Sequence, residues 1–148
     1  MCSRASWLSA SADAAISPYL GVYLAAILAV VGHSKPIYFG FKGGKGVLVA
    51  AGAILAVQPV LLPVLALIFL ACLLPTGMVS LGSITMAAAY PVLTLVYSLL
   101  HDLPTQDVVV CTVGAAIVGG MVIWMHRTNI QRIRDGKEYR FGQKHKSR

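Results

Sequence analysis

Charged side chains are scarce in this sequence. Only 11% of the 148 residues are charged and 57% are hydrophobic, whereas about a quarter of the residues of an ordinary soluble domain are charged. Between Gly46 and His126 there is no Lys or Arg, and the only acidic residues there are Asp102 and Asp107. A soluble surface cannot be built from such an interval, so the composition predicts an integral membrane protein.

Cysteine is sparse too, and it follows no pattern. Cys2, Cys72 and Cys111 lack the spacing of a disulfide framework or of a metal site. We therefore expect structural thiols, no metal and no cofactor. Residues 1–17 lack the apolar core of a signal peptide, and we interpret them as a disordered leader that need not be native.

The apolar residues fall into five segments separated by proline, glycine or polar residues. A single helix from Val47 to Leu74 would be roughly 42 Å long, against a hydrocarbon core of about 30 Å. Pro59 and Pro63 interrupt this run. We therefore expect an all-α, polytopic membrane bundle with proline-broken helices. The expected segments are Tyr19–Val31, Val47–Val57, Pro59–Leu74, Ile84–Leu100 and Thr105–Met125.

Basic residues predict the orientation of the chain. Eight of the twelve Lys and Arg residues lie at or after Arg127, and three more lie between Lys35 and Lys45. Positive loops face the cytoplasm, so we expect residues 18–126 to form the transmembrane domain and residues 127–148 a basic cytoplasmic tail. An even number of crossings must then separate the loop from the tail. Because the tail directly follows an apolar segment, we expect it to meet the lipid bilayer and not nucleic acid.

A glycine-rich loop lies between the first two apolar segments. Its sequence from Gly40 to Gly46 is Gly-Phe-Lys-Gly-Gly-Lys-Gly. Successive backbone N–H groups of such a loop can cradle an anion, and Lys45 adds a charge suited to phosphate. The spacing does not fit a nucleotide P-loop, and no Ser or Thr follows the Gly-Lys pair. A plain turn with a basic membrane anchor remains the alternative.

A second group of polar residues follows the last apolar segment. If that helix continues, His126, Asn129 and Ile133 lie near one face at three- to four-residue spacing. His126 has a side chain that titrates near neutral pH and could act as a base. An interfacial basic helix that only orients the protein is the alternative.

The two groups together resemble the PlsY family of bacterial acyl-phosphate:glycerol-3-phosphate acyltransferases. The second family motif is matched by Gly32, His33, Pro36 and residues 41–47. The third is matched by His126, Arg127, Asn129, Ile130, Arg132, Gly136 and Glu138. Residues 79–84 match a segment between them, so the likeness covers about residues 19–142 in the family's order. Leu48-Val49 and Lys35 depart from the family pattern.

The resemblance implies a membrane enzyme of phospholipid biosynthesis. Such an enzyme transfers a fatty acyl group from acyl phosphate to glycerol 3-phosphate, giving lysophosphatidate, without a cofactor. It implies a bacterial inner-membrane location and catalytic roles for Lys45, His126 and Asn129. The residues that it implies for substrate binding are Lys42, Gly43, Gly44, Gly46, His33, Ser80, Ser83 and Glu138. Purely structural roles remain open for His33, Ser80 and Ser83.

Two other hypotheses remain open. The family's first motif, which carries a serine and an arginine of the active site, is absent, so we expect residues 1–148 alone to have little or no activity. The chain would then be a catalytically incomplete membrane fragment. Broken helices also occur in small anion or lipid transporters, although no inverted repeat is visible. The sequence sets neither the acyl-chain preference nor the oligomeric state.

Overall fold

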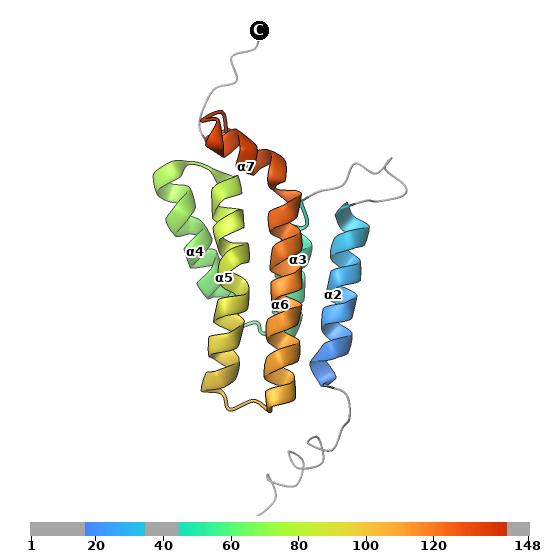
Figure 1. Cartoon of the computed structure of the whole chain (residues 1–148). Helices are drawn as coiled ribbons and strands as arrows, with labels where there is room; N and C mark the ends of the chain where they lie inside the picture. Colours follow the sequence, from blue (N-terminus) through green and yellow to red (C-terminus); the bar gives the residue numbers. More distant parts are fainter. Residues whose placement is uncertain (1–16, 35–44, 142–148) are drawn as a thin grey trace, which may run out of the picture.

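The computed structural model describes residues 17–34 and 45–141, and this part of the chain is built from helices. Figure 1 shows α2, α5 and α6 side by side along one direction, with α7 lying across the end at which α6 finishes. The helices are α2 Pro18–Ser34, α3 Val47–Val57, α4 Leu61–Thr76, α5 Val79–Leu100, α6 Thr105–Met125 and α7 Arg127–Arg134. The prediction of an all-α bundle is confirmed.

Among the described residues, α5 and α6 are long and apolar enough to cross a membrane. The apolar helices α2, α3 and α4 are shorter. At about 1.5 Å per residue, the 11 residues of α3 extend only roughly 16 Å. The long apolar run is thus divided into two helices, as its length and its prolines predicted.

The predicted segment bounds are correct for α3 and α6 and wrong for α2, α4 and α5; α2 extends from Pro18 to Ser34, beyond the expected Tyr19–Val31. Helix α4 begins at Leu61, because Pro59 lies in the preceding turn. Pro63 does not interrupt α4, since a proline is tolerated in the first turn, where its missing N–H has no helical partner. Helix α5 begins at Val79 and not at Ile84. The break before it is confined to Gly77, whose positive φ of 69° ends α4, and extended Met78.

Close helix contacts depend on glycines at three interfaces. A Cβ on Gly82 would lie 2.8 Å from Phe69 of α4, and one on Gly114 would overlap the Tyr23 ring of α2. A Cβ on Gly119 would overlap the carbonyl oxygen of Ala87 in α5. Small residues allow helices to pack closely where the surroundings are apolar. These glycines hold α5 against α4 and hold α6 against both α2 and α5.

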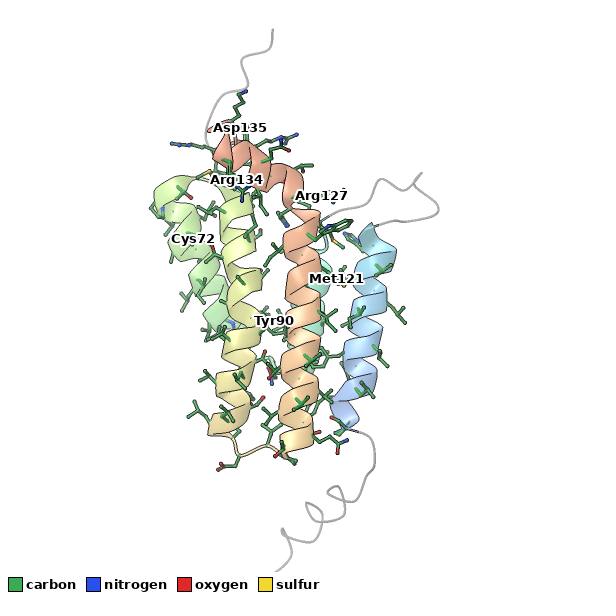
Figure 2. The ribbon with its side chains drawn as sticks, in the orientation of Figure 1. Cys72, Tyr90, Met121, Arg127, Arg134 and Asp135 are labelled. Atoms are coloured by element: carbon green, nitrogen blue, oxygen red, sulfur yellow. The ribbon has the colours of Figure 1, made fainter. Side chains whose placement is uncertain are left out.

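Polar side chains also join the helices inside the bundle. The hydroxyls of Tyr23 on α2 and Tyr90 on α5 lie 3.2 Å apart, and Figure 2 labels Tyr90 midway along the bundle. Near the opposite end from α7, Ser17 Oγ donates to Asp107 Oδ1 at 2.5 Å. These bonds fix α2 against α5 and α6. The first residues of α2 and of α6 therefore lie at the same end of the bundle, and the two helices run in the same direction (Figure 1).

The neighbouring glycines of α6 provide a test of this packing. Gly119→Ala should destabilise the protein by roughly 1–3 kcal/mol, the usual cost of overpacking, because the new methyl group displaces Ala87. Gly120 has no atom within 4 Å of its would-be Cβ, so Gly120→Ala should leave stability unchanged or raise it by up to roughly 1 kcal/mol. Thermal unfolding in detergent measures both. Equal stability of the two variants would contradict the packing described for α5 and α6.

Candidate functional site

Buried polar residues gather at the end of the bundle that α7 covers. Ser80 and Ser83 lie in the first turns of α5, His126 lies between α6 and α7, and Asn129 lies on α7. These four side chains are between 2% and 7% exposed. Buried polar groups in apolar surroundings are costly unless they are paired, so this cluster is a candidate site.

A break in the chain at His126 brings α7 over the cluster. His126 has φ −89° and ψ 7°, and it ends α6 and precedes α7. Its carbonyl accepts the Ile130 N–H at 2.8 Å, so the new helix starts at once in another direction. Asn129 on α7 is buried and reaches Ser80 of α5.

Asn129 connects three parts of the chain. Its Nδ2 donates to Ser80 Oγ at 2.8 Å and to Glu138 Oε1 at 2.7 Å. Glu138 reaches this position because the chain turns back at Gly136, which has a φ of 66°. The returning segment is held by the Phe141 N–H, which donates to the Gly77 carbonyl at 2.7 Å. One amide group thus joins the start of α5, helix α7 and the segment after α7.

The Glu138 carboxyl is held in its ionised form. Burial raises its pKa, but hydrogen bonds from Ser80 and Asn129 and the charges of Lys45 and Arg132 outweigh burial. The net effect is a pKa below the ordinary value. Sequence reasoning gave Arg132 no role, although it follows Asn129 by three residues, the spacing of neighbours on a helix surface.

His126 is held in its neutral form, with a defined tautomer. Its Nδ1 lies 2.7 Å from the Val122 carbonyl oxygen, and because a carbonyl only accepts, the proton is on Nδ1. Burial lowers the pKa of His126, and the nearby charge of Lys45 lowers it further, against opposing effects of Val122 and Glu138. Near neutral pH the lone pair of Nε2 is therefore available.

Lys45 belongs to the same electrostatic cluster. It is exposed, and its charge acts on both His126 and Glu138. The next residue, Gly46, has φ 72°, and a Cβ there would lie 3.2 Å from Val30 Cγ1 and 3.3 Å from Met125 Sδ. The positive φ favours glycine at this gap between α2 and α6, where a Cβ would also crowd both side chains. The gap places Lys45 beside the α6–α7 junction.

Other residues that were predicted to belong to the site lie outside this cluster of polar contacts or outside the described residues. Ser83 Oγ donates to the Val79 carbonyl at 3.0 Å, so its hydroxyl proton is used within α5. His33 is exposed in the last turn of α2. Lys42, Gly43 and Gly44 lie outside the described residues, and their phosphate-binding roles stay predictions.

Comparison with known proteins places this geometry in a family. The family described as "Glycerol-3-phosphate acyltransferase" matches residues 4–136. The chain belongs to this family. It is 40% identical over 134 residues to the glycerol-3-phosphate acyltransferase of Syntrophomonas wolfei, covering 90% of this chain and 63% of the relative. A Staphylococcus saprophyticus member is also 40% identical, with coverages of 89% and 61%.

The solved structures of the family agree with the fold. A crystal structure of PlsY, an integral membrane glycerol 3-phosphate acyltransferase, in its lysophosphatidic acid form has a TM-score of 0.65 and 32% identity. The match covers 84% of this chain and 68% of that one. The glycerol 3-phosphate form gives 0.63 and 31%. The chain is therefore a membrane protein of this acyltransferase family, and it spans about three fifths of the length of the curated relatives.

The state of His126 can be measured directly. With ¹⁵N-labelled histidine in detergent, His126 should show the Nδ1-protonated tautomer and a pKa below about 6.5, the ordinary value, because burial and Lys45 both oppose its charge. The spectrum of His126→Gln assigns its signals among the four histidines. An Nε2-protonated ring, or a pKa above the ordinary value, would contradict the assignment.

Proposed function

We propose that this chain forms the phosphate-handling part of an acyltransferase that uses acyl phosphate and glycerol 3-phosphate. The single observation that carries the proposal is the convergence of Lys45, His126, Asn129 and Glu138 at one end of the bundle. Both substrates carry phosphate, and the family of the chain acts on glycerol 3-phosphate by name. Segments that are far apart in the sequence thus supply one polar site beside an apolar membrane domain.

The reaction is an acyl transfer between two oxygens. The 1-hydroxyl oxygen of glycerol 3-phosphate forms a bond to the acyl carbonyl carbon, and the bond from this carbon to the phosphate oxygen breaks. Inorganic phosphate leaves and lysophosphatidate forms. The hydroxyl proton passes to a base, for which neutral His126 offers Nε2, or it leaves with the phosphate.

Lys45 and the first turn of α5 suit the anionic groups. Lys45 supplies a point charge for phosphate, and the start of α5 adds the positive end of a helix dipole near Ser80. Asn129, held by Glu138, keeps Ser80 in place. Holding two reactants in attack geometry can itself account for much of a rate acceleration.

We infer the orientation from charge alone. The ends of α2 and α6 and the whole of α7 lie at one end of the bundle (Figure 1). Among the described residues, this end carries Arg127, Arg132, Arg134, Lys137 and Arg140. By the positive-inside rule this end faces the cytoplasm of a bacterial inner membrane, where acyl phosphate and glycerol 3-phosphate would reach it.

Lys45→Ala tests the role of the lysine. Loss of a charged hydrogen bond costs about 1.5–3 kcal/mol, so acyl transfer from acyl phosphate to glycerol 3-phosphate should fall roughly ten- to a hundredfold. Because the first motif is expected to be required, the assay uses the chain joined to the N-terminal region of a family member, alongside the chain alone.

Lys137→Ala is the matched control, because Lys137 is an exposed lysine of the segment after α7. It should retain nearly full activity at equal expression. A Lys45→Ala variant within threefold of the unsubstituted protein would support the anchor alternative instead. So would equal losses in the two variants.

A further inference from the structure

Helix α7 has two chemically different faces. Asn129 lies on its buried face and takes part in the site. Arg127, Gln131 and Arg134 are exposed, and their spacing of four and three residues places them on one face of the helix. Figure 2 labels Arg127 near the end of α7 that joins α6 and Arg134 near the other end.

The exposed face begins at a tryptophan. Trp124 lies in the last turn of α6 and is 61% exposed. The Arg127 guanidinium lies 4.3 Å from the centroid of this ring, and its Nη1 donates to the Trp124 carbonyl at 3.4 Å. Tryptophan at the end of an apolar helix sits at the depth of the lipid headgroups, so Arg127 lies at that depth too.

The charge around this face is positive. Residues 127–141 contain five basic and two acidic residues, and one of the acids, Glu138, is bonded inward to Asn129. Asp135 is therefore the only acidic residue exposed on this part of the described chain. Basic residues next to a membrane helix attract anionic lipids, and arginine binds phosphate through two parallel hydrogen bonds.

We propose that Trp124, Arg127, Gln131 and Arg134, here called the outer stripe, form a binding site for the phosphate of an anionic phospholipid in the surrounding leaflet. Both arginines and the Gln131 amide can donate to phosphate oxygens. The exposed indole of Trp124 can pack against the apolar part of a lipid next to its headgroup, a contact that free phosphate cannot make. This site lies on the opposite face of α7 from Asn129.

Lipid bound here would also hold the catalytic face in place. Helix α7 has only eight residues and is separated from α6 by the break at His126, so its position depends on what it contacts on both faces. A lipid on the outer stripe would restrain Asn129 against Ser80. This consequence for activity rests on the proposed function, whereas the binding itself does not.

Trp124 is a built-in reporter of the site. With Trp7→Phe as background, Trp124 is the only tryptophan of the full chain. The protein is reconstituted in vesicles of phosphatidylcholine with a minor fraction of phosphatidylglycerol, with bromine on the chains of one lipid or of the other. Quenching of Trp124, corrected for the mole fraction of brominated lipid, should show phosphatidylglycerol at least about fivefold enriched.

Paired variants separate the stripe from general surface charge. Arg127→Gln with Arg134→Gln should abolish the enrichment. Lys137→Gln with Arg140→Gln removes the same charge from the segment after α7, where Arg140 lies beside Gly77, and should retain it. Arg127→Lys with Arg134→Lys keeps the charge and should retain part of the enrichment. This result would show that the loss in the glutamine pair comes from the missing charge and not from misfolding.

Three results would overturn the proposal: no enrichment in the Trp7→Phe protein, equal losses in the two glutamine pairs, or full enrichment in the stripe pair. Because substrates are absent, each of these leaves the acyltransferase proposal standing. Conversely, a Lys45→Ala variant that keeps full acyl transfer would leave the lipid site standing.

Discussion

The hydrogen bonds of one amide, that of Asn129, determine how the polar end of this protein is assembled. Ser80 and Glu138, its two acceptors, lie 49 and 9 residues away in sequence. Both bonds require α7 to lie across the end of α5, and this in turn requires the break at His126. An unpaired buried amide would cost roughly 1–3 kcal/mol, so each of these features supports the others.

The bundle beneath this site explains why the polar residues can meet at all. Gly82, Gly114 and Gly119 each occupy a position where a side chain would collide with a neighbouring helix, and a Cβ on Gly46 would crowd Val30 and Met125. Gly119 and Gly114 set the distance from α6 to α5 and α2, and Gly46 lets the start of α3 approach Met125. Because apolar side chains gain little by leaving lipid for another helix, such close packing replaces the hydrophobic effect as the main attraction.

The sequence predicted the helices well where local signals agreed. Gln58-Pro59 marks the end of α3, and the polar turn before Thr105 marks the start of α6. Prediction failed at the start of α5, which was expected at Ile84: Gly82 and Ser83 are poor residue types inside a helix, yet both lie within α5, and Gly82 packs against Phe69. Only the tertiary structure contains the information that makes these positions acceptable.

In the candidate site too, some features could be predicted from the sequence and others depend on the tertiary structure. Its residue types and order, from Lys45 through Ser80 to His126 and Glu138, could be taken from the sequence and its resemblance. The bend at His126 could not, because no glycine or proline marks it, and neither could the bond from Asn129 to Ser80, which depends on packing across 49 residues. The inward turn of the Ser83 hydroxyl to Val79 is likewise a property of the folded helix.

The charges of the described residues limit what this part of the site can do. Lys45 and Arg132 are positive, Glu138 is held negative and His126 is held neutral. Their sum is a single positive charge, whereas the two substrates proposed above each carry a negatively charged phosphate, and unpaired charge is costly away from water. Further donors are therefore needed. The resemblance implies that Lys42 and the backbone amides of Gly43 and Gly44 are among them, as is, in the family, the arginine of the first motif, which residues 1–148 lack. Because His126 is neutral, it provides a proton acceptor among cations that can only bind phosphate.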